Sequence, residues 1–307
     1  MRAPTLLATL LCLLPAALDA QPAGALPAAT FLPGSTRAMA LGDAYMMDAG
    51  HADALFYHPA LLTEASGFGL DLQRWGPEGT AAAASGAMEW LGGGIGIGLR
   101  TLQYSAPGPG AAAAPGGQDH LFERGAEPSS EFIATIGYAR ETFFEIDLGV
   151  GVDFADVRVG GSHESGVLVD VGVSREVGPV VVGLTAHDIG SKPISDHGSA
   201  PSRVALGAGG YGHELGIFDL GYAATVGYDE ADETVTWGGG VEVGYWPVQG
   251  RTFVARVGVH DVPDGSDRSP LTTGFAFWGD DITIEWAWHP FADASDGGTH
   301  RFGVRWR

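Results

Sequence analysis

The side chains best suited to bind a cation or to line a ligand passage are grouped near the N-terminus. Three carboxylates and two imidazoles lie close together there: Asp43, Asp48, His51, Asp53 and His58. Such groups could in principle coordinate a divalent ion, but their spacing matches neither a zinc site nor an EF-hand. The favoured interpretation is that they cap short helices and hydrogen-bond to a surrounding wall. We therefore predict no metal site and no cofactor.

Catalytic chemistry has no recognisable residue pattern in this chain. The histidines are scattered, and no Ser-His-Asp arrangement or nucleophile elbow can be assembled from local sequence. The acidic stretches 229–233 and 261–267 lack EF-hand spacing, so a cation site in them is the less favoured alternative. The glycine-rich run 92–98 is not followed by the helix that a phosphate-binding loop requires. The sequence predicts a protein that is not an enzyme.

The N-terminal group of side chains lies within residues 37–62, a segment that does not look like a strand. Its apolar residues are spaced three or four apart, which favours two short helical turns interrupted by Gly42 and Gly50. Pro59 fixes its own φ and pushes His58 towards an extended conformation, so the segment should end in a corner. We expect a compact, mostly apolar plug.

After this segment the hydrophobic pattern has a period of two. The clearest run places Ile146, Leu148, Val150, Val152 and Phe154 on one face. We count about fourteen such segments of roughly eight to twelve residues, the length of a tilted membrane-spanning strand. Since no later apolar run is long enough for a transmembrane helix, a membrane role requires a barrel. The fold class predicted is an all-β, transmembrane antiparallel β-barrel with the plug in its lumen.

The face opposite the apolar one carries glycines, small residues and sparse charges of both signs. A soluble sandwich would show Lys, Thr, Ser and Glu on that face, whereas small and oppositely charged residues suit the crowded inside of a barrel. Alternate glycines should mark places where the plug or a strand approaches closely. The charges predicted to face the lumen are Asp71, Arg100, Asp147, Asp153, Asp170, Arg203, Asp219, Glu242, Arg256, Glu285, Arg301 and Arg305.

The connections between these strands alternate in length. The even-numbered ones are tight, including one expected at Gly212–His213, and most odd-numbered ones are longer. This asymmetry predicts even turns in the periplasm and odd loops outside the cell. Tryptophans and tyrosines near strand ends, among them Trp278 and Trp288, are expected to form aromatic girdles at the membrane interfaces.

The first 20 residues have the pattern of a secretory signal peptide. Arg2 precedes an apolar run, and small residues lead to a cleavage site near Ala20. Cys12, the only cysteine, lies inside this signal. The mature chain should therefore have no disulfide and no thiolate chemistry.

Composition limits the partners and the domain organisation. The formal net charge of −21 argues against binding to nucleic acid. No linker divides the chain, so we expect an N-terminal extension over 21–36, a plug segment over 37–65 and one β-barrel over 66–307.

A family resemblance rests on the pattern Arg-Ala-x-x-Leu-Gly-x-Ala followed by Asp-Ala-Leu-Phe-x-x-Pro-Ala-Leu. This pattern resembles the N-terminal signature of the PorV/PorQ family and, more distantly, of the FadL-type outer-membrane transporters. The matching residues are Arg37, Ala38, Leu41, Gly42, Ala44, Asp53, Ala54, Leu55, Phe56, Pro59, Ala60 and Leu61. The families typically carry Asn before Pro-Ala, whereas this chain has His58.

The resemblance implies a place in the outer membrane of a Gram-negative bacterium, in contact with its lipid. Likeness to PorV/PorQ implies a non-enzymatic accessory barrel of type IX secretion or surface attachment, with secreted proteins or secretion machinery as partners. Likeness to FadL-type transporters implies uptake of hydrophobic small molecules, with a plug that moves to open a lateral exit. The short external loops favour the PorV/PorQ interpretation. A soluble secreted β-sandwich acting as a binding module is the third alternative.

Overall fold

The computed structural model describes residues 28–30, 32–45, 50–75, 79–106, 127–159, 162–189, 202–230, 233–248, 251–262, 268–291 and 297–306. The predicted signal peptide, part of the predicted 21–36 extension and Asp48 lie outside these described residues. None of the helices in the described part of the chain is long and apolar enough to cross a membrane.

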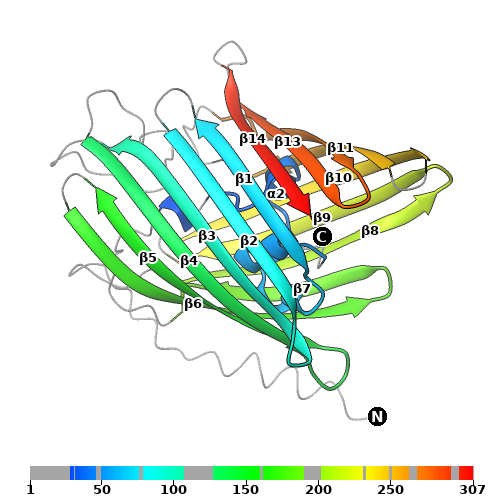
Figure 1. The fold of residues 1–307 in the computed structure, drawn as a ribbon, viewed down its shortest axis with the longest axis horizontal. Helices are drawn as coiled ribbons and strands as arrows, with labels where there is room; N and C mark the ends of the chain where they lie inside the picture. The colour runs from blue at the N-terminus through cyan, green and yellow to red at the C-terminus, as the bar shows by residue number, and fades with distance from the viewer. Residues whose placement is uncertain are drawn as a thin grey trace.

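Fourteen antiparallel strands in the described residues close into a single barrel, in which each strand pairs with its neighbours in sequence and β1 pairs with β14 (Figure 1). The strands are β1 (Gly67–Trp75), β2 (Gly79–Trp90), β3 (Gly93–Ala106), β4 (Glu127–Glu141), β5 (Asp147–Val159), β6 (Ser162–Val177), β7 (Val180–His187), β8 (Arg203–Leu215), β9 (Phe218–Asp229), β10 (Thr234–Val248), β11 (Arg251–His260), β12 (Leu271–Trp278), β13 (Ile282–Pro290) and β14 (Gly298–Trp306). The predicted antiparallel barrel is confirmed, and the β-sandwich alternative is wrong because the sheet closes on itself.

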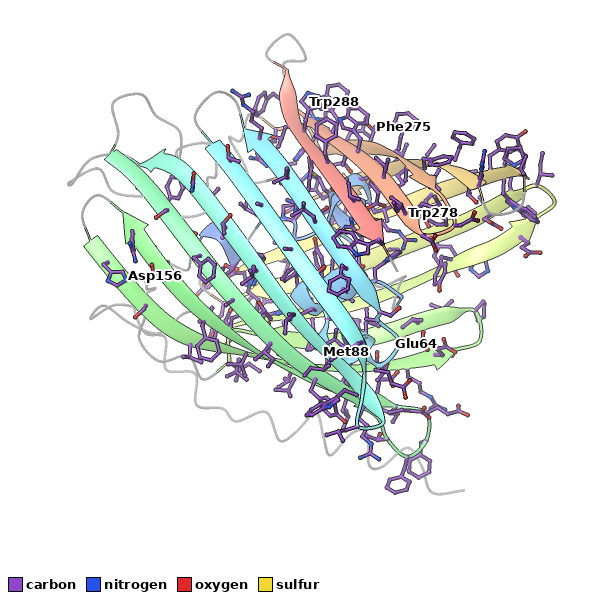
Figure 2. The ribbon with its side chains drawn as sticks, in the orientation of Figure 1. Glu64, Met88, Asp156, Phe275, Trp278 and Trp288 are labelled. Carbon is purple, nitrogen blue, oxygen red and sulfur yellow. The ribbon has the colours of Figure 1, made fainter. Side chains whose placement is uncertain are left out.

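The two faces of the barrel wall differ as the alternation predicts. In β14, Arg301 and Arg305 are buried inside, whereas Phe302 and Trp306 are exposed outside. The same outward exposure of large apolar side chains recurs around the barrel, as Phe275 of β12 illustrates (Figure 2). Soluble proteins rarely expose a continuous apolar surface, and an apolar outer band is the mark of a membrane barrel. The outer face is therefore suited to lipid.

The turn between β8 and β9 is not where the sequence predicts it. The strands are joined at Gly216–Ile217, and Gly216 has a positive φ of 71°. The expected turn at Gly212–His213 is wrong because these residues lie inside β8, where the register shifts between Gly210 and His213. A β-bulge places an extra residue in a strand, and here its glycine has the positive φ that also marks a turn.

Four short helical elements precede β1 in the described residues, and Figure 1 shows those of the plug inside the ring of strands. They are η1 (Ala28–Thr30), α2 (Thr36–Ala40), η2 (Ala52–Phe56) and η3 (Pro59–Thr63). The sequence predicts two helical turns in the plug, whereas the part of it that the structure describes has three. His58 is extended as expected, with φ −156°, but Pro59 starts η3 instead of ending the segment. Proline is favoured at the first helical position because no N–H is needed there.

Two sets of inward-facing glycines receive the plug. One set faces η2 and η3 and comprises Gly94, Gly96, Gly98, Gly137, Gly149 and Gly172. The other faces residues 36–42 and comprises Gly238, Gly240, Gly258, Gly274 and Gly303. A Cβ atom added at Gly240 would lie 2.7 Å from Leu41 Cα, and one added at Gly172 would lie 2.9 Å from His58 Cε1. The alternating glycines thus give the plug room to touch the wall.

The close approach of the plug to inward-facing glycines predicts opposite outcomes for substitutions at two neighbouring glycines of β10. Gly240→Val should displace the plug, because the added side chain would meet Leu41, and overpacking of this kind typically costs about 1–3 kcal/mol. Gly239→Val points outward and should be tolerated, since an added Cβ finds its nearest neighbour, Ala223 O, at 3.3 Å. Limited trypsin digestion at Arg37, which is buried in the docked plug, measures the difference. Equal cleavage of both variants would contradict the glycine contact.

Candidate functional site

Arg305 of β14 lies at the centre of a buried ion network that joins the plug to the wall. Its Nη2 lies 2.7 Å from Asp53 Oδ2 in η2 and 3.2 Å from Asp71 Oδ2 in β1. Its Nη1 lies 3.0 Å from Glu285 Oε2 in β13. The same guanidinium donates to Ser35 Oγ, the N-cap of α2, at 3.1 Å. One side chain therefore contacts two plug elements and two strands.

Arg256 of β11 extends this network along the same wall to β10. Its Nε donates to Glu242 Oε2 at 3.0 Å, and its Nη1 donates to Glu285 Oε1 at 2.7 Å. Glu242 of β10 also accepts a 3.1 Å hydrogen bond from Arg37 Nε of the plug and forms a second, shorter contact with Arg37 Nη2. The carboxylate of Glu242 is thus shared by one plug arginine and one wall arginine.

The network also crosses the seam where the barrel closes. Arg301 of β14 donates to Gln73 Oε1 of β1 at 2.7 Å, and its Nε lies 3.6 Å from Asp71 Oδ1. Asp71 accepts hydrogen bonds from the backbone N–H and the hydroxyl of Thr36, at 2.7 and 2.5 Å. Plug docking and barrel closure therefore share the carboxylate of Asp71.

We call the following residues the central network: Arg37, Asp53, Asp71, Glu242, Arg256, Glu285, Arg301 and Arg305. Every one of these side chains is buried, and the four arginines balance the four carboxylates in charge. Removing one partner of a buried pair leaves an uncompensated charge, which typically costs about 3–5 kcal/mol. The central network therefore holds the plug strongly only while it is complete.

Asp53 shows the electrostatic consequence of this arrangement. Burial alone would raise the pKa of Asp53, but the Arg305 guanidinium, with hydrogen bonds from Ser35 and Tyr45, lowers this pKa to about 2. The Tyr45 hydroxyl donates to Asp53 Oδ1 at 2.7 Å. Asp53 therefore stays ionised at any pH near neutrality.

A second group of charges lies on the side of the lumen formed by β3 and β5–β8. Arg100 Nη2 donates to Asp153 Oδ2 at 3.0 Å, and Arg203 Nη2 donates to Asp188 Oδ2 at 3.1 Å. Asp170 accepts the backbone N–H of Asp188 at 3.0 Å, and Oδ2 of Asp170 lies 3.2 Å from His187 Nδ1. We call His187, Asp170, Asp188 and Arg203 the histidine cluster.

The predicted lumen charges are placed as follows. Nine are buried inside the barrel: Asp71, Arg100, Asp153, Asp170, Glu242, Arg256, Glu285, Arg301 and Arg305. Arg203 is partly buried in the histidine cluster, whereas Asp147 and Asp219 are half-buried near the starts of β5 and β9, outside both groups. Sequence reasoning missed His187 and Asp188. The sequence did offer a signal for His187. It lies two residues after Thr185, which is buried, so both side chains belong to the inner face of β7.

The predicted plug residues are distributed over the two glycine-lined walls. Leu41 and Ala44 pack with Ala223 of β9, and Gly42 donates its N–H to Thr272 Oγ1 at 3.1 Å. Ala54, Leu55, Phe56 and Ala60 are buried within η2 and η3.

His58 differs from the sequence-based interpretation. It precedes η3 but does not cap that helix with its side chain. Neither ring nitrogen has a hydrogen-bond partner in the described part of the chain. Burial, with nearby His187 adding to the effect, lowers the pKa of His58 to about 4. The described residues also contain no group of three or more potential metal ligands.

Trp278 is another correction. The sequence predicts it in an outer girdle, but it follows the inward parity of β12, and its ring centroid lies 5.8 Å from the Arg37 guanidinium carbon. Figure 2 shows Trp278 at the end of its strand, near the β12–β13 turn. A cation above an indole ring is favourable, so Trp278 supports the plug.

The inner wall of β2–β5 carries two apolar clusters beside its buried charges. One cluster packs η1 and Leu32 of the N-terminal segment against Ala81, Leu102, Tyr104, Ile133 and Ala155. A second packs Ala52, Leu55, Leu62 and Ala65 against Ala87 and Ala139. The first lies towards the long-loop end of β2–β4 and the second towards the tight-turn end, with the buried Arg100 of β3 between them. We call this surface the apolar strip.

Comparison with known proteins identifies the fold. The sequence matches no protein-family model and no curated protein. A mutant of the TodX monoaromatic hydrocarbon channel aligns with a TM-score of 0.55 and 11% identity, over 88% of this chain and 96% of that one. The CymD monoaromatic hydrocarbon channel aligns at 0.50 and 11%, over 88% and 95%. A Pseudomonas aeruginosa FadL homologue aligns at 0.50 and 10%, over 89% and 98%. The chain has the FadL-like barrel fold found in outer-membrane proteins.

The ionised Asp53 predicts a specific acid sensitivity. Because the folded pKa of about 2 lies below the ordinary value of 3.8, the stabilisation is complete above about pH 4 and is lost as pH falls towards 2. Asp53→Asn should reduce the free energy of unfolding by about 2 kcal/mol at neutral pH, and the difference should vanish near pH 2. Urea unfolding in detergent measures it.

Asp281→Asn provides the control, because Asp281 lies in the exposed β12–β13 turn. It should leave the free energy of unfolding unchanged. If Asp53→Asn lowers the free energy of unfolding by the same amount at every pH, the Asp53–Arg305 charge pair is not the cause.

Proposed function

We propose that this protein is an outer-membrane channel that admits small hydrophobic molecules, with the N-terminal plug as its gate. The observation that carries this proposal is the apolar strip along β2–β4, on which Leu55 and Leu62 of the plug are seated. Once these side chains move away, the strip offers an apolar surface along the lumen. A hydrophobic molecule could replace these apolar contacts. Asp53 and Arg37 leave the wall with the plug, but Arg305 keeps Asp71 and Glu285 as partners and Glu242 keeps Arg256.

The plug is bonded internally and should move as one body. The backbone N–H of Ser35 donates to the Tyr57 hydroxyl at 2.9 Å, which ties α2 to the end of η2. Tyr57 stacks on Tyr45 with ring centroids 4.5 Å apart, and Tyr45 bonds Asp53. Ala38, Ala54 and Leu61 pack together with Tyr45. Opening therefore means displacement of this unit from the wall.

The structural neighbours support the same proposal. TodX and CymD are described as monoaromatic hydrocarbon channels, and both share the barrel fold over most of their length. We extend their substrate class, small apolar molecules, to this chain. The PorV/PorQ secretion role that the sequence favours has no counterpart among these neighbours and stays a prediction. The absence of enzymatic activity is likewise a proposal.

Uptake by intact cells tests the function. Cells that carry the full-length protein in the outer membrane should accumulate a radiolabelled monoaromatic hydrocarbon several-fold faster than cells with an empty vector. A sugar of similar size should enter both at the same rate. Deleting residues 37–62 should leave an inserted barrel that also admits the sugar, because the lumen loses its plug.

Two results would contradict the proposal. Hydrocarbon uptake no faster than in the vector control would remove the transport function. Co-purification of secreted proteins with the barrel, without hydrocarbon uptake, would favour the secretion role instead.

A further inference from the structure

His187 joins the plug to the barrel wall through both of its ring nitrogens. Nε2 lies 3.0 Å from the backbone carbonyl oxygen of Tyr57, in the plug. Nδ1 lies 3.2 Å from Oδ2 of Asp170, in β6. The imidazole is largely buried, with 14% of its side chain exposed.

Both partners of His187 are acceptors. A carbonyl oxygen carries no proton, and an ionised carboxylate only accepts hydrogen bonds. Asp170 also accepts the backbone N–H of Asp188 at 3.0 Å, which favours its ionised form. Thr185 Oγ1, 3.3 Å from Nε2, already donates its proton to the Val171 carbonyl at 3.1 Å.

A neutral imidazole cannot satisfy this arrangement. It has one N–H, so one ring nitrogen would turn its lone pair towards either the Tyr57 carbonyl or the Asp170 carboxylate. The imidazolium has two N–H groups and donates to both. The geometry therefore requires the doubly protonated ring when the plug is docked.

The charges around the ring are consistent with a cation. Asp170 in β6 and Asp188 beside His187 are negative, whereas Arg203 in β8 is positive and is paired with Asp188 at 3.1 Å. Arg100 in β3 is paired with Asp153 in β5 at 3.0 Å. Around the ring there are therefore three carboxylates and two arginines. A positive charge on His187 makes the numbers of negative and positive charges equal.

His58 is the group that faces His187 from the plug. Its ring is fully buried, and its nitrogens lack partners in the described part of the chain. A second positive charge beside the imidazolium would be repulsive, so His58 should stay neutral while His187 is charged.

We propose that protonated His187 is a latch that holds the plug corner at Tyr57 against β6 and β7, and that loss of its proton loosens the plug. This regulation rests on the proposed function in taking the plug as the gate. When the proton leaves, one nitrogen presents a lone pair to an oxygen and the contact becomes repulsive. The latch is present at low pH and is lost as pH rises through the titration of His187.

Thiol labelling tests the latch without any transported molecule. The reporter is Ala54→Cys, whose parent residue is fully buried in the plug, in a Cys12→Ala background that removes the only native cysteine. Its labelling by a small water-soluble maleimide is divided by that of a separate Asp281→Cys reporter, which corrects for thiolate ionisation. The purified full chain is measured in detergent from about pH 5.5 to 9, the range that brackets an ordinary histidine.

The normalised labelling should rise with pH in the wild-type background. In His187→Gln it should be raised about tenfold at the lowest pH and should no longer depend on pH, since a charged hydrogen bond is lost. His163→Gln is the matched control, because His163 pairs with Asp156 on the exposed surface at 2.6 Å, and it should behave as wild type. Figure 2 shows Asp156 far along β5 from the tight turns.

His58→Gln adds an independent check. It should keep the protection at low pH, because the latch itself is intact. Heat-modifiable gel mobility must show that each variant still forms a closed barrel.

The latch is overturned if wild-type labelling does not change with pH, or if His187→Gln is as protected as wild type. Both results leave hydrocarbon uptake untouched as a separate question. Conversely, pH-dependent labelling without hydrocarbon uptake would support the His187 latch and contradict the proposal that the channel transports small hydrophobic molecules.

Discussion

The contact between Arg305 and Asp53, 2.7 Å long and fully buried, is the interaction on which the rest of the structure depends. The same guanidinium contacts Asp71 across the β1–β14 seam and Glu285 in the next strand. A charge buried in the lumen must find a counter-charge, because unpaired ions are costly away from water. Here the plug supplies part of that counter-charge. The barrel therefore closes around a plug that completes its ion pairs.

The lumen is divided into two walls with different roles. The side formed by β10–β14 and β1 binds the plug through ion pairs and through glycines such as Gly240 and Gly303, which let α2 approach the backbone. The side formed by β2–β5 offers the apolar strip, on which η1, η2 and η3 are seated. Ion pairs give the plug a fixed orientation, and the apolar contacts can be exchanged for those of a hydrophobic molecule. This division of roles is consistent with the gate that we propose.

Much of this architecture follows from local sequence patterns. Alternating residues such as Leu148 and Gly149 identify strands, and the sign-mixed charges of one face identify the lumen, because a side-chain period of two separates the faces without knowledge of the fold. Partners could not be predicted, since Arg37 and Glu242 are 205 residues apart in sequence. The prediction of a turn at Gly212–His213 was wrong because a glycine in a bulge and a glycine in a turn have the same backbone freedom. His187 was missed because its role depends on the Tyr57 carbonyl, which no side-chain pattern reveals.

The claim that the plug must leave the wall during uptake is tested most directly by a reversible disulfide between plug and wall. A Cβ atom at Gly303 of β14 would lie 2.7 Å from Thr36 Oγ1 of α2, so Thr36→Cys with Gly303→Cys places two thiols within disulfide reach. The measurement is hydrocarbon uptake by cells that carry this pair, before and after reduction, with each single cysteine variant as control. The account predicts that oxidation blocks uptake and that reduction restores it, while the single variants do not respond. Uptake that is equally fast with the disulfide formed would contradict the claim that the plug must leave the wall.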